Sequence, residues 1–309
     1  MKFVITSVLV LFSLKLSAQA ANLNEDARLN QWKNAIVKIE SIQQRYNFAQ
    51  VDAILHHQTD TMHHLSQHEK YNTQGELLTI KDTIRGTGIL VSDGNKVYLV
   101  TAKHVIKATE NTASHMETVN DLISMKTDAR NKTSNDINLM NLAEGKPGLQ
   151  PFIFSSDQDD LGIISLQKES YKPILAYLKQ MGCTPVSTQS FGDTDDIMTG
   201  AEILAVGFPA LPGNNRNQIA TIKGTVIQNN KLGSSFTANL NVYPGNTGSP
   251  VIEKDKLIGI LSFQSGISTN IDAATHSYER ASSAIVIKAS AILPLLRELQ
   301  RHEGHSSFK

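Results

Sequence analysis

Short runs of β-branched residues, separated by Gly, Asn and Asp, constrain the fold of this chain more than any other feature of its sequence. They begin at about Leu77 and include TGILV, KVYLVTA, LGIISL, EILAVGF, ATIKGTVI, FTANLNV and LIGILSF. Most are only a few residues long and end at residues that favour turns, which is typical of strands in antiparallel β-proteins. The sequence therefore predicts an all-β barrel or sandwich over this region.

Helical spacing is confined to the two ends of the chain. Residues 24–46 place apolar side chains three and four positions apart with charged residues between them, which predicts an amphipathic helix. These positions are Leu29, Trp32, Ile36, Ile39, Ile42 and Tyr46. The same spacing returns in KASAILPLLRELQRH at Ile292, Leu295, Leu296 and Leu299. We therefore expect a helical extension over residues 21–76, a β-domain with a C-terminal helix over residues 77–300, and a tail over residues 301–309.

Residues 1–20 have the pattern of a cleaved export signal. Lys2 precedes an apolar run from Phe3 to Leu14, and Ala18-Gln19-Ala20 matches the small-x-small sequence of a signal-peptidase site. The run is too short for a membrane span, which needs about 20 apolar residues. We therefore expect an exported protein, periplasmic or secreted, without a stable membrane anchor.

Composition narrows the class of protein further. Cys183 is the only cysteine, so the exported chain forms no internal disulfide bond, which favours a bacterial protein over an animal secreted one. Lys plus Arg equals Asp plus Glu at 29 each, so the chain has no basic field that would hold nucleic acid phosphates or anionic lipid. We expect no nucleic acid partner.

A histidine-rich stretch, HHQTDTMHHLSQH, falls within the predicted extension. If this stretch is helical, His56, Asp60, His64 and His68 recur every four residues and form one stripe that could hold a divalent metal ion. A solvated helix face or a linker explains the same residues without any closed ligand geometry. We expect no metal site and no cofactor.

Three of the predicted strands are accompanied by polar residues that are informative together. YLVTAKHVI carries His104, QDDLGIISL carries Asp160 with Asp159 and Asp157 nearby, and PGNTGSPVI carries the hydroxyl of Thr247 in a glycine-rich turn. Acyl transfer by a hydroxyl needs a general base, a carboxylate that orients the base, and backbone N–H donors for the oxyanion. The sequence offers all three.

These three segments resemble the trypsin-like, chymotrypsin-fold serine peptidases, especially the bacterial members without disulfide bonds. GTGILVSDGNKVYLVTAKHVI is similar to the opening hairpin and the histidine strand, DLGIISL to the aspartate strand, and GNTGSPVIEKDKLIGILSF to the nucleophile loop and the hairpin after it. The resemblance covers about residues 80–295 and holds in order. It implies two six-stranded β-barrels and an endopeptidase that acts on peptide or protein substrates.

The resemblance also implies roles for individual residues. His104 would be the general base and Asp160, directly before LGII, would orient it, with Asp159 and Asp157 as alternatives. Gly245 and Thr247 would supply the oxyanion N–H groups. Ser262, Phe263 and Gln264 would lie along the substrate backbone, and Asn241 near the base of the specificity pocket.

Thr247 departs from the family pattern, because it stands where the family has its nucleophilic serine. Threonine keeps the hydroxyl but adds a γ-methyl that restricts its rotamers. The alternative to a working His-Asp-Thr peptidase is therefore an impaired pseudoprotease that binds peptides or a protein partner. Ser249, two residues on, is a less favourable nucleophile because it is displaced from the oxyanion donors. Residues 21–76 could also be an inhibitory pro-segment.

Overall fold

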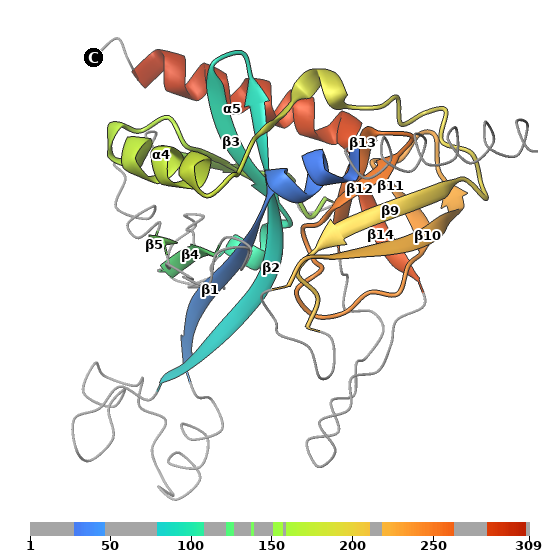
Figure 1. Cartoon of the computed structure of the whole chain (residues 1–309), viewed down its shortest axis with the longest axis horizontal. Coiled ribbons are helices and arrows are strands. Elements are labelled where there is room, and N and C mark those ends of the chain that lie inside the picture. The colour runs from blue at the N-terminus through green and yellow to red at the C-terminus, as the bar shows by residue number, and fades with distance from the viewer. Residues whose placement is uncertain are drawn as a thin grey trace, which may run out of the picture.

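The structure, a computed structural model, describes residues 28–46, 79–107, 122–126, 137–138, 151–156, 159–210, 218–262 and 283–306. These residues form two β-structures with helices around them (Figure 1). The first is an eight-stranded sheet built from the earlier part of the chain. The second is a closed six-stranded barrel built from the later part.

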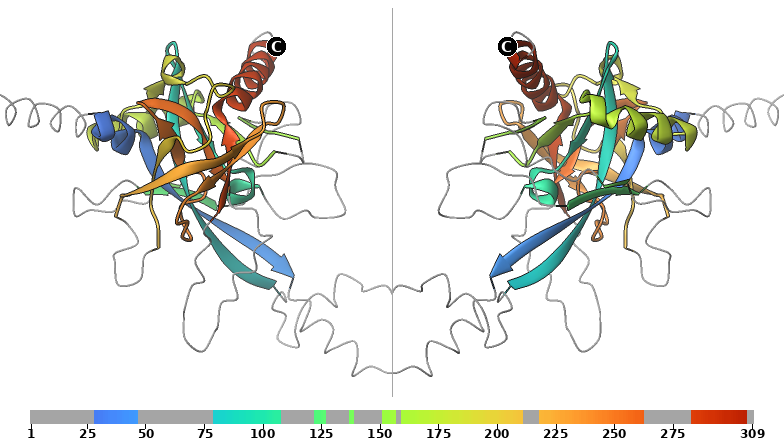
Figure 2. Two further views of the ribbon diagram at one scale, coloured as in Figure 1. Left: turned by 90° about the vertical axis from the view of Figure 1, so that its right-hand side faces the viewer. Right: turned by 90° about the vertical axis from the view of Figure 1, so that its left-hand side faces the viewer.

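The strands of the sheet lie in the order β5-β4-β1-β2-β3-β7-β6, and β8 pairs with β2 in parallel. The other neighbours along this path are antiparallel. The strands are β1 (Ile36–Tyr46), β2 (Thr79–Asp93), β3 (Lys96–Thr101), β4 (Leu122–Lys126), β5 (Ile137–Asn138), β6 (Phe152–Phe154), β7 (Gly162–Ser165) and β8 (Val186–Ser187). At their far ends β1 and β2 extend together as a two-stranded ribbon (Figures 1 and 2).

The strands of the barrel close in the order β10-β11-β14-β13-β12-β9. They are β9 (Glu202–Gly207), β10 (Ala220–Asn229), β11 (Ser235–Asn239), β12 (Pro250–Glu253), β13 (Lys256–Ser262) and β14 (Ala284–Lys288). Because a closed barrel pairs every strand on both sides, it leaves no strand edge open to another chain. The predicted barrel and its antiparallel strands are confirmed for this half.

Three apolar cores account for the arrangement of the two halves. One fills the barrel, and one fills the concave side of the sheet and contacts the helix α4 (Lys172–Gln180). The third lies between the halves, where Tyr98 and Ile163 of the sheet share a cluster with Val206 and Ile260 of the barrel. Burying apolar side chains from both halves in one cluster fixes the two β-structures against each other.

The C-terminal helix predicted from the spacing of Ile292, Leu295, Leu296 and Leu299 is confirmed. α5 (Ile292–Ser306) lies across the outside of the sheet, as Figure 1 shows, and buries these four side chains in the core between the halves. Gln300 adds polar contacts, because its amide donates to Asp93 Oδ2 at 2.8 Å and to the Tyr98 hydroxyl at 3.1 Å. The helix therefore joins the two β-structures rather than lying on one of them.

The helix predicted over residues 24–46 is wrong in its second half. Residues 28–35 are helical, but residues 36–46 form β1 and pair with β2 and β4. Ile36 is buried in the core between the halves, whereas Val37 and Ile39 are buried in the core of the sheet. A strand that is buried on both faces loses the alternation of apolar and polar residues, so its apolar positions also satisfied a helical spacing.

The pairing of β1 also bears on the predicted extension and on the first barrel. Residues 36–46 are an internal strand of the sheet, so removing residues 21–76 as a pro-segment would take a strand out of the fold. A second six-stranded barrel is not confirmed among the residues that the structure describes, since the first half is an open path of strands there.

Residues 1–20 and the histidine-rich stretch lie outside the described residues. Within the described ranges, no helix is both long enough and apolar enough to cross a membrane.

Candidate active site

His104 lies on α3 (Lys103–Ile106), a single helical turn that follows β3 after Ala102. Two features hold this turn in place. Val105 and Ile106 are fully buried in the core of the sheet, and the buried hydroxyl of Ser41 on β1 donates to the Val105 carbonyl at 2.6 Å. The His104 side chain itself remains 44% exposed. The core therefore fixes the backbone of α3 while the imidazole faces solvent.

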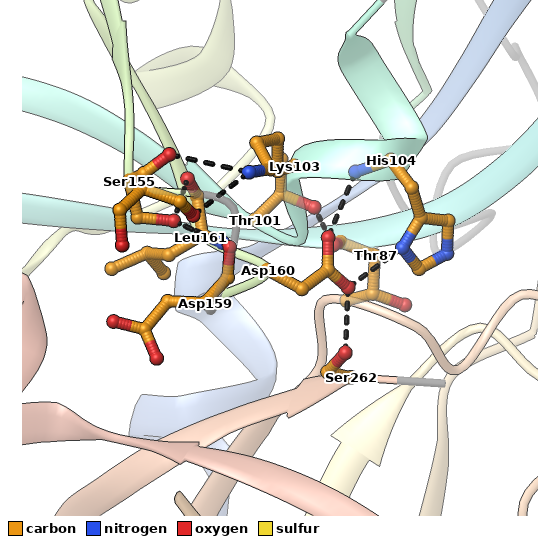
Figure 3. A network of polar contacts seen from close by, with 10 residues as sticks. Thr87, Thr101, Lys103, His104, Ser155, Asp159, Asp160, Leu161 and Ser262 are labelled. Carbon is orange, nitrogen blue, oxygen red and sulfur yellow. Dashed lines mark hydrogen bonds and ion pairs between the residues drawn. The ribbon is translucent and has the colours of Figure 1, made fainter. Parts of the chain in front are cut away.

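Asp160 lies directly before β7, and three hydrogen bonds converge on its carboxylate (Figure 3). Its Oδ1 accepts from the backbone N–H of His104 at 2.9 Å, and its Oδ2 lies 2.6 Å from His104 Nδ1. The hydroxyl of Ser262, at the end of β13, also donates to Oδ2 at 2.6 Å. The sheet and the barrel thus both contribute donors to one carboxylate.

These contacts determine the charge of Asp160 and the tautomer of His104. Burial by itself would raise the pKa of Asp160, but the hydrogen bonds and the charge of His104, with the Ser262 hydroxyl, hold that pKa below its usual range. An ionised carboxylate can only accept hydrogen bonds, so His104 Nδ1 must carry a proton. In the neutral ring Nε2 is then left with a lone pair, which is the form that a general base requires.

The lowered pKa of Asp160 predicts how stability depends on pH. Because this carboxyl group is more acidic in the folded than in the unfolded protein, its contribution is complete above the unfolded pKa of about 3.9 and disappears as the pH falls through the lower folded value. We expect the free energy of unfolding of Asp160→Asn to differ most from wild type above pH 5 and to converge with it towards pH 2. Urea unfolding from pH 2 to 6 measures this, with Asp196→Asn as the exposed control. A difference that stays constant over the range would contradict it.

Thr247 lies in the turn between Tyr243 and Pro250, and the barrel holds this turn through its backbone. Asn246 N–H donates to the Tyr243 carbonyl, Ser249 N–H donates to the Asn246 carbonyl, and Gly248 N–H donates to the Leu261 carbonyl. Gly245 and Gly248 have φ values of +92° and +86°. A Cβ at these two glycines would lie 2.3 Å from the Phe208 carbonyl oxygen and 2.0 Å from the Thr87 carbonyl oxygen, so the turn requires glycine at both.

The same turn leaves two backbone N–H groups without an acceptor. Within the described part of the chain, neither Gly245 N–H nor Thr247 N–H makes a hydrogen bond, whereas those of Asn246, Gly248 and Ser249 all do. The Pro244 carbonyl accepts from Ala210 N–H at 2.7 Å, and since this peptide is trans, the Gly245 N–H points the opposite way. Two unpaired donors two residues apart are the arrangement that stabilises an oxyanion.

Thr87 on β2 connects this turn to the sheet. Its N–H donates to the Thr247 carbonyl at 2.7 Å, its hydroxyl donates to the Gly245 carbonyl at 2.8 Å, and its carbonyl accepts from the Thr101 hydroxyl at 2.7 Å. The neighbouring Gly86 lets the elements approach, because a Cβ there would lie 2.8 Å from the Val105 side chain and 2.9 Å from the Thr247 carbonyl oxygen. The turn with Thr247 and the helix with His104 therefore meet at Gly86.

The Thr247 hydroxyl and the His104 imidazole do not form a hydrogen bond with each other in the described structure. No hydrogen bond links Thr247 to the His104 ring among the residues described, and Thr247 is only 7% exposed. Ser249 is fully buried, and its hydroxyl lies so close to Gly207 of β9 that a Cβ there would be 2.0 Å from it. Ser249 is therefore the less accessible of the two hydroxyl groups, and the choice of Thr247 over Ser249 as nucleophile stays a prediction.

The four residues expected to bind substrate differ in where the structure places them. Ser262 is fully buried and its hydroxyl is bonded to Asp160, so this side chain supports the carboxylate. Phe263 and Gln264 lie outside the described residues. Asn241 lines a groove of about 1470 Å³ beside β9, β10 and β12, and none of His104, Asp160 and Thr247 lines that groove. Binding of substrate by Asn241 stays a prediction.

Of the two alternatives to Asp160 and the four residues of the predicted metal stripe, the structure describes only Asp159. Asp159 points away from His104 (Figure 3). Its carboxylate accepts a hydrogen bond from the Ser234 hydroxyl. Asp157, His56, Asp60, His64 and His68 lie outside the described residues. Among the side chains that are described, no three His, Cys, Asp or Glu residues are grouped as a metal site would require.

Sequence reasoning missed Ser262 as the second partner of Asp160 and Thr87 as the connection between sheet and turn. Their contacts join residues 102 and 158 positions apart, which no local pattern reveals. A serine that ends an apolar strand was the only available signal for Ser262.

The chain was compared with protein-family models, with curated proteins and with solved structures. The family model of the trypsin-like peptidase domain matches residues 86–260. A variant of the HtrA-type protease AlgW, solved with a decapeptide, is similar in fold with a TM-score of 0.51 and 15% identity, over 90% of this chain and 67% of that one. A second structure of AlgW with a decapeptide gives a TM-score of 0.48 and 14% identity over 89% and 67%. No curated protein matches the chain.

Proposed function

Because the chain belongs to the trypsin-like peptidase family, we propose that it is an endopeptidase that cleaves peptide bonds through His104, Asp160 and Thr247. The observation that carries the proposal is the 2.6 Å contact between His104 Nδ1 and Asp160, next to a turn with two unpaired N–H groups. A satisfied surface histidine would not need a carboxylate that is 12% exposed and has three donors. Such an arrangement is what a general base for acyl transfer requires.

In the first step the Thr247 hydroxyl oxygen attacks the carbonyl carbon of the scissile bond, and its proton moves to His104 Nε2. The carbonyl oxygen becomes an oxyanion, which the N–H groups of Gly245 and Thr247 bind. The tetrahedral intermediate collapses when the C–N bond breaks, and the leaving amine takes the proton from Nε2. Asp160 stays ionised throughout, and stabilises the imidazolium and keeps the ring oriented.

In the second step a water molecule attacks the acyl ester on Thr247. His104 Nε2 takes a proton from the water and returns it to Thr247 as the ester bond breaks. The same donors bind the second oxyanion. The residues named supply every proton transfer in the cycle, so the reaction needs no cofactor.

A covalent probe tests the proposal directly. We expect an alkyl fluorophosphonate, which phosphonylates activated hydroxyl groups, to react with Thr247 in a protein comprising residues 21–309. The His104→Ala variant of the same protein should stay unmodified. Peptide mapping by mass spectrometry locates the adduct, and a mixed peptide library records cleavage by the same two proteins. Labelling at another residue, or equal labelling of His104→Ala, would contradict the assignment of Thr247 as the nucleophile and His104 as its base.

One observation favours a second candidate function. Since no hydrogen bond joins Thr247 to His104 in the described structure, and the Thr247 carbonyl is fixed by Thr87, the site could bind peptides without cutting them. If the protein is a pseudoprotease of this kind, wild type and His104→Ala should bind the library peptides equally well, and both should release them intact. Export of the chain through residues 1–20 remains a proposal from the sequence.

A further inference from the structure

Asp159 and Asp160 are consecutive carboxylates, and each accepts a hydroxyl hydrogen bond from the barrel. Ser262 on β13 donates to Asp160 at 2.6 Å, and Ser234, in the turn between β10 and β11, donates to Asp159. The Asp159 contact is the only polar side-chain contact that its carboxylate makes with the described residues. The loop that carries Asp160 therefore touches the barrel at two points.

The barrel side of the Asp159 contact is held by a buried cation. The turn at residues 230–234 is bonded at both ends to Lys288 of β14, whose Nζ donates to the Asn230 carbonyl at 2.6 Å and whose N–H donates to the Ser234 carbonyl at 2.8 Å. Lys288 is 1% exposed, and the Asp195 carboxylate lies 4.0 Å away with its side chain 70% exposed. Burial lowers the pKa of Lys288, and the hydrogen bond to the Asn230 carbonyl is the closest polar contact of its ammonium group among the described residues.

The sheet side of the loop is held just as closely. Lys103, next to His104, donates from Nζ to the carbonyls of Ser155 and Ser156 at 3.2 and 2.9 Å (Figure 3). The Ser155 hydroxyl closes the loop by donating to the carbonyl of Asp159 at 2.7 Å. Ser155 and Ser156 are thus bonded to α3, and Asp159 and Asp160 are bonded to the barrel.

We propose that Ser234 and Asp159 are positioning residues, which hold the loop of Asp160 against the barrel at a second point so that Asp160 stays aligned with His104. Ser262 joins Asp160 to the barrel, and the bond from Ser234 to Asp159 adds a second contact with the barrel one residue away, which restricts movement of these residues relative to the barrel. The two halves also carry the two reacting side chains, since His104 comes from the sheet and Thr247 from the barrel. The Ser234–Asp159 hydrogen bond therefore helps to set the geometry of a site whose residues come from both the sheet and the barrel.

The test replaces each partner and follows the His104 Nδ1 proton by NMR. We expect Ser234→Ala and Asp159→Ala to shift or broaden this resonance to the same extent, and the double variant to add nothing further. Asp159→Asn keeps an oxygen that accepts the Ser234 hydroxyl and should preserve the resonance. The matched control is Ser235→Ala, because Ser235 is half-buried, is next in sequence and makes no side-chain hydrogen bond with the described residues. A Ser234→Ala resonance identical to that of Ser235→Ala, with only the melting temperature lowered, would overturn the proposal.

The kinetic consequence rests on the proposed function and is measured separately. In whichever of wild type and Thr247→Ser cleaves a peptide, Ser234→Ala should lower kcat about tenfold and leave KM within about twofold, because alignment acts on the transition state. An unchanged kcat in a cleaving protein would refute the positioning role. If neither protein cleaves a peptide, the peptidase proposal fails. The NMR result still shows whether the Ser234–Asp159 hydrogen bond positions Asp160 against His104.

Discussion

Replacing Asp160 with asparagine should lower kcat about ten-thousandfold, which is the order of loss expected when a triad histidine is held in the wrong tautomer. With its oxygen in the place of Oδ1, the asparagine can still accept from the His104 N–H, and its NH2 group, in the place of Oδ2, can donate to the Ser262 hydroxyl oxygen, so the fold of the loop should persist. However, a neutral amide no longer requires the proton to reside on His104 Nδ1, and it cannot stabilise the imidazolium. With the proton on Nε2, the ring cannot take the proton from Thr247.

The measurement is steady-state cleavage of a fluorogenic peptide selected from the library, in wild type and in Thr247→Ser. Asp159→Asn is the matched control, because it removes the same charge one residue earlier and keeps its hydrogen-bond acceptor. A kcat for Asp160→Asn within about tenfold of the parent protein would mean that His104 is not oriented by this carboxylate.

Replacing Thr247 with serine should raise kcat about a hundredfold, equivalent to about 2.7 kcal/mol of barrier. The turn cannot move to accommodate the γ-methyl group, because Thr87 fixes the Thr247 carbonyl and Gly248 N–H is bonded to the Leu261 carbonyl. The hydroxyl must therefore reach His104 by side-chain rotation alone, and β-branching restricts that rotation. Serine has the same hydroxyl without the restriction.

The matched control is Thr194→Ser, which removes a γ-methyl from a threonine that is 1% exposed and whose hydroxyl is bonded to Ser290, away from the site. We expect no change in kcat there. Equal kcat values for wild type and Thr247→Ser would show that the methyl group does not limit the reaction. A fall in Thr247→Ser would mean that this cleft requires threonine.

Local sequence patterns predicted the parts of the fold that rest on local contacts. The barrel strands, α5 and the segments that carry His104, Asp160 and Thr247 were each visible as a run of a few residues with turn signals beside it. The glycine-rich turn was visible because Gly245 and Gly248 need positive φ angles. These features depend on neighbours along the chain, and the pattern of neighbours is what a sequence displays.

The remaining features depend on partners far away in the sequence. The spacing of Ile36, Ile39 and Ile42 predicted a helix, and only pairing with β2 and β4 makes this segment a strand. The Ser234–Asp159 and Ser262–Asp160 bonds join residues 75 and 102 positions apart. The sequence showed two adjacent aspartates, but which of them faces His104 is decided by how the sheet and the barrel pack together.

The ribbon of β1 and β2 determines where this fold can accept new sequence. Tyr46 and Thr79 are register partners at the end of the ribbon, so the chain between them begins and ends at the same place. The entropy of closing such a loop grows only with the logarithm of its length, by about 0.6 kcal/mol for each doubling. A change in the length of the chain between Tyr46 and Thr79 therefore has a small entropic cost and leaves the register of β1 and β2 unchanged.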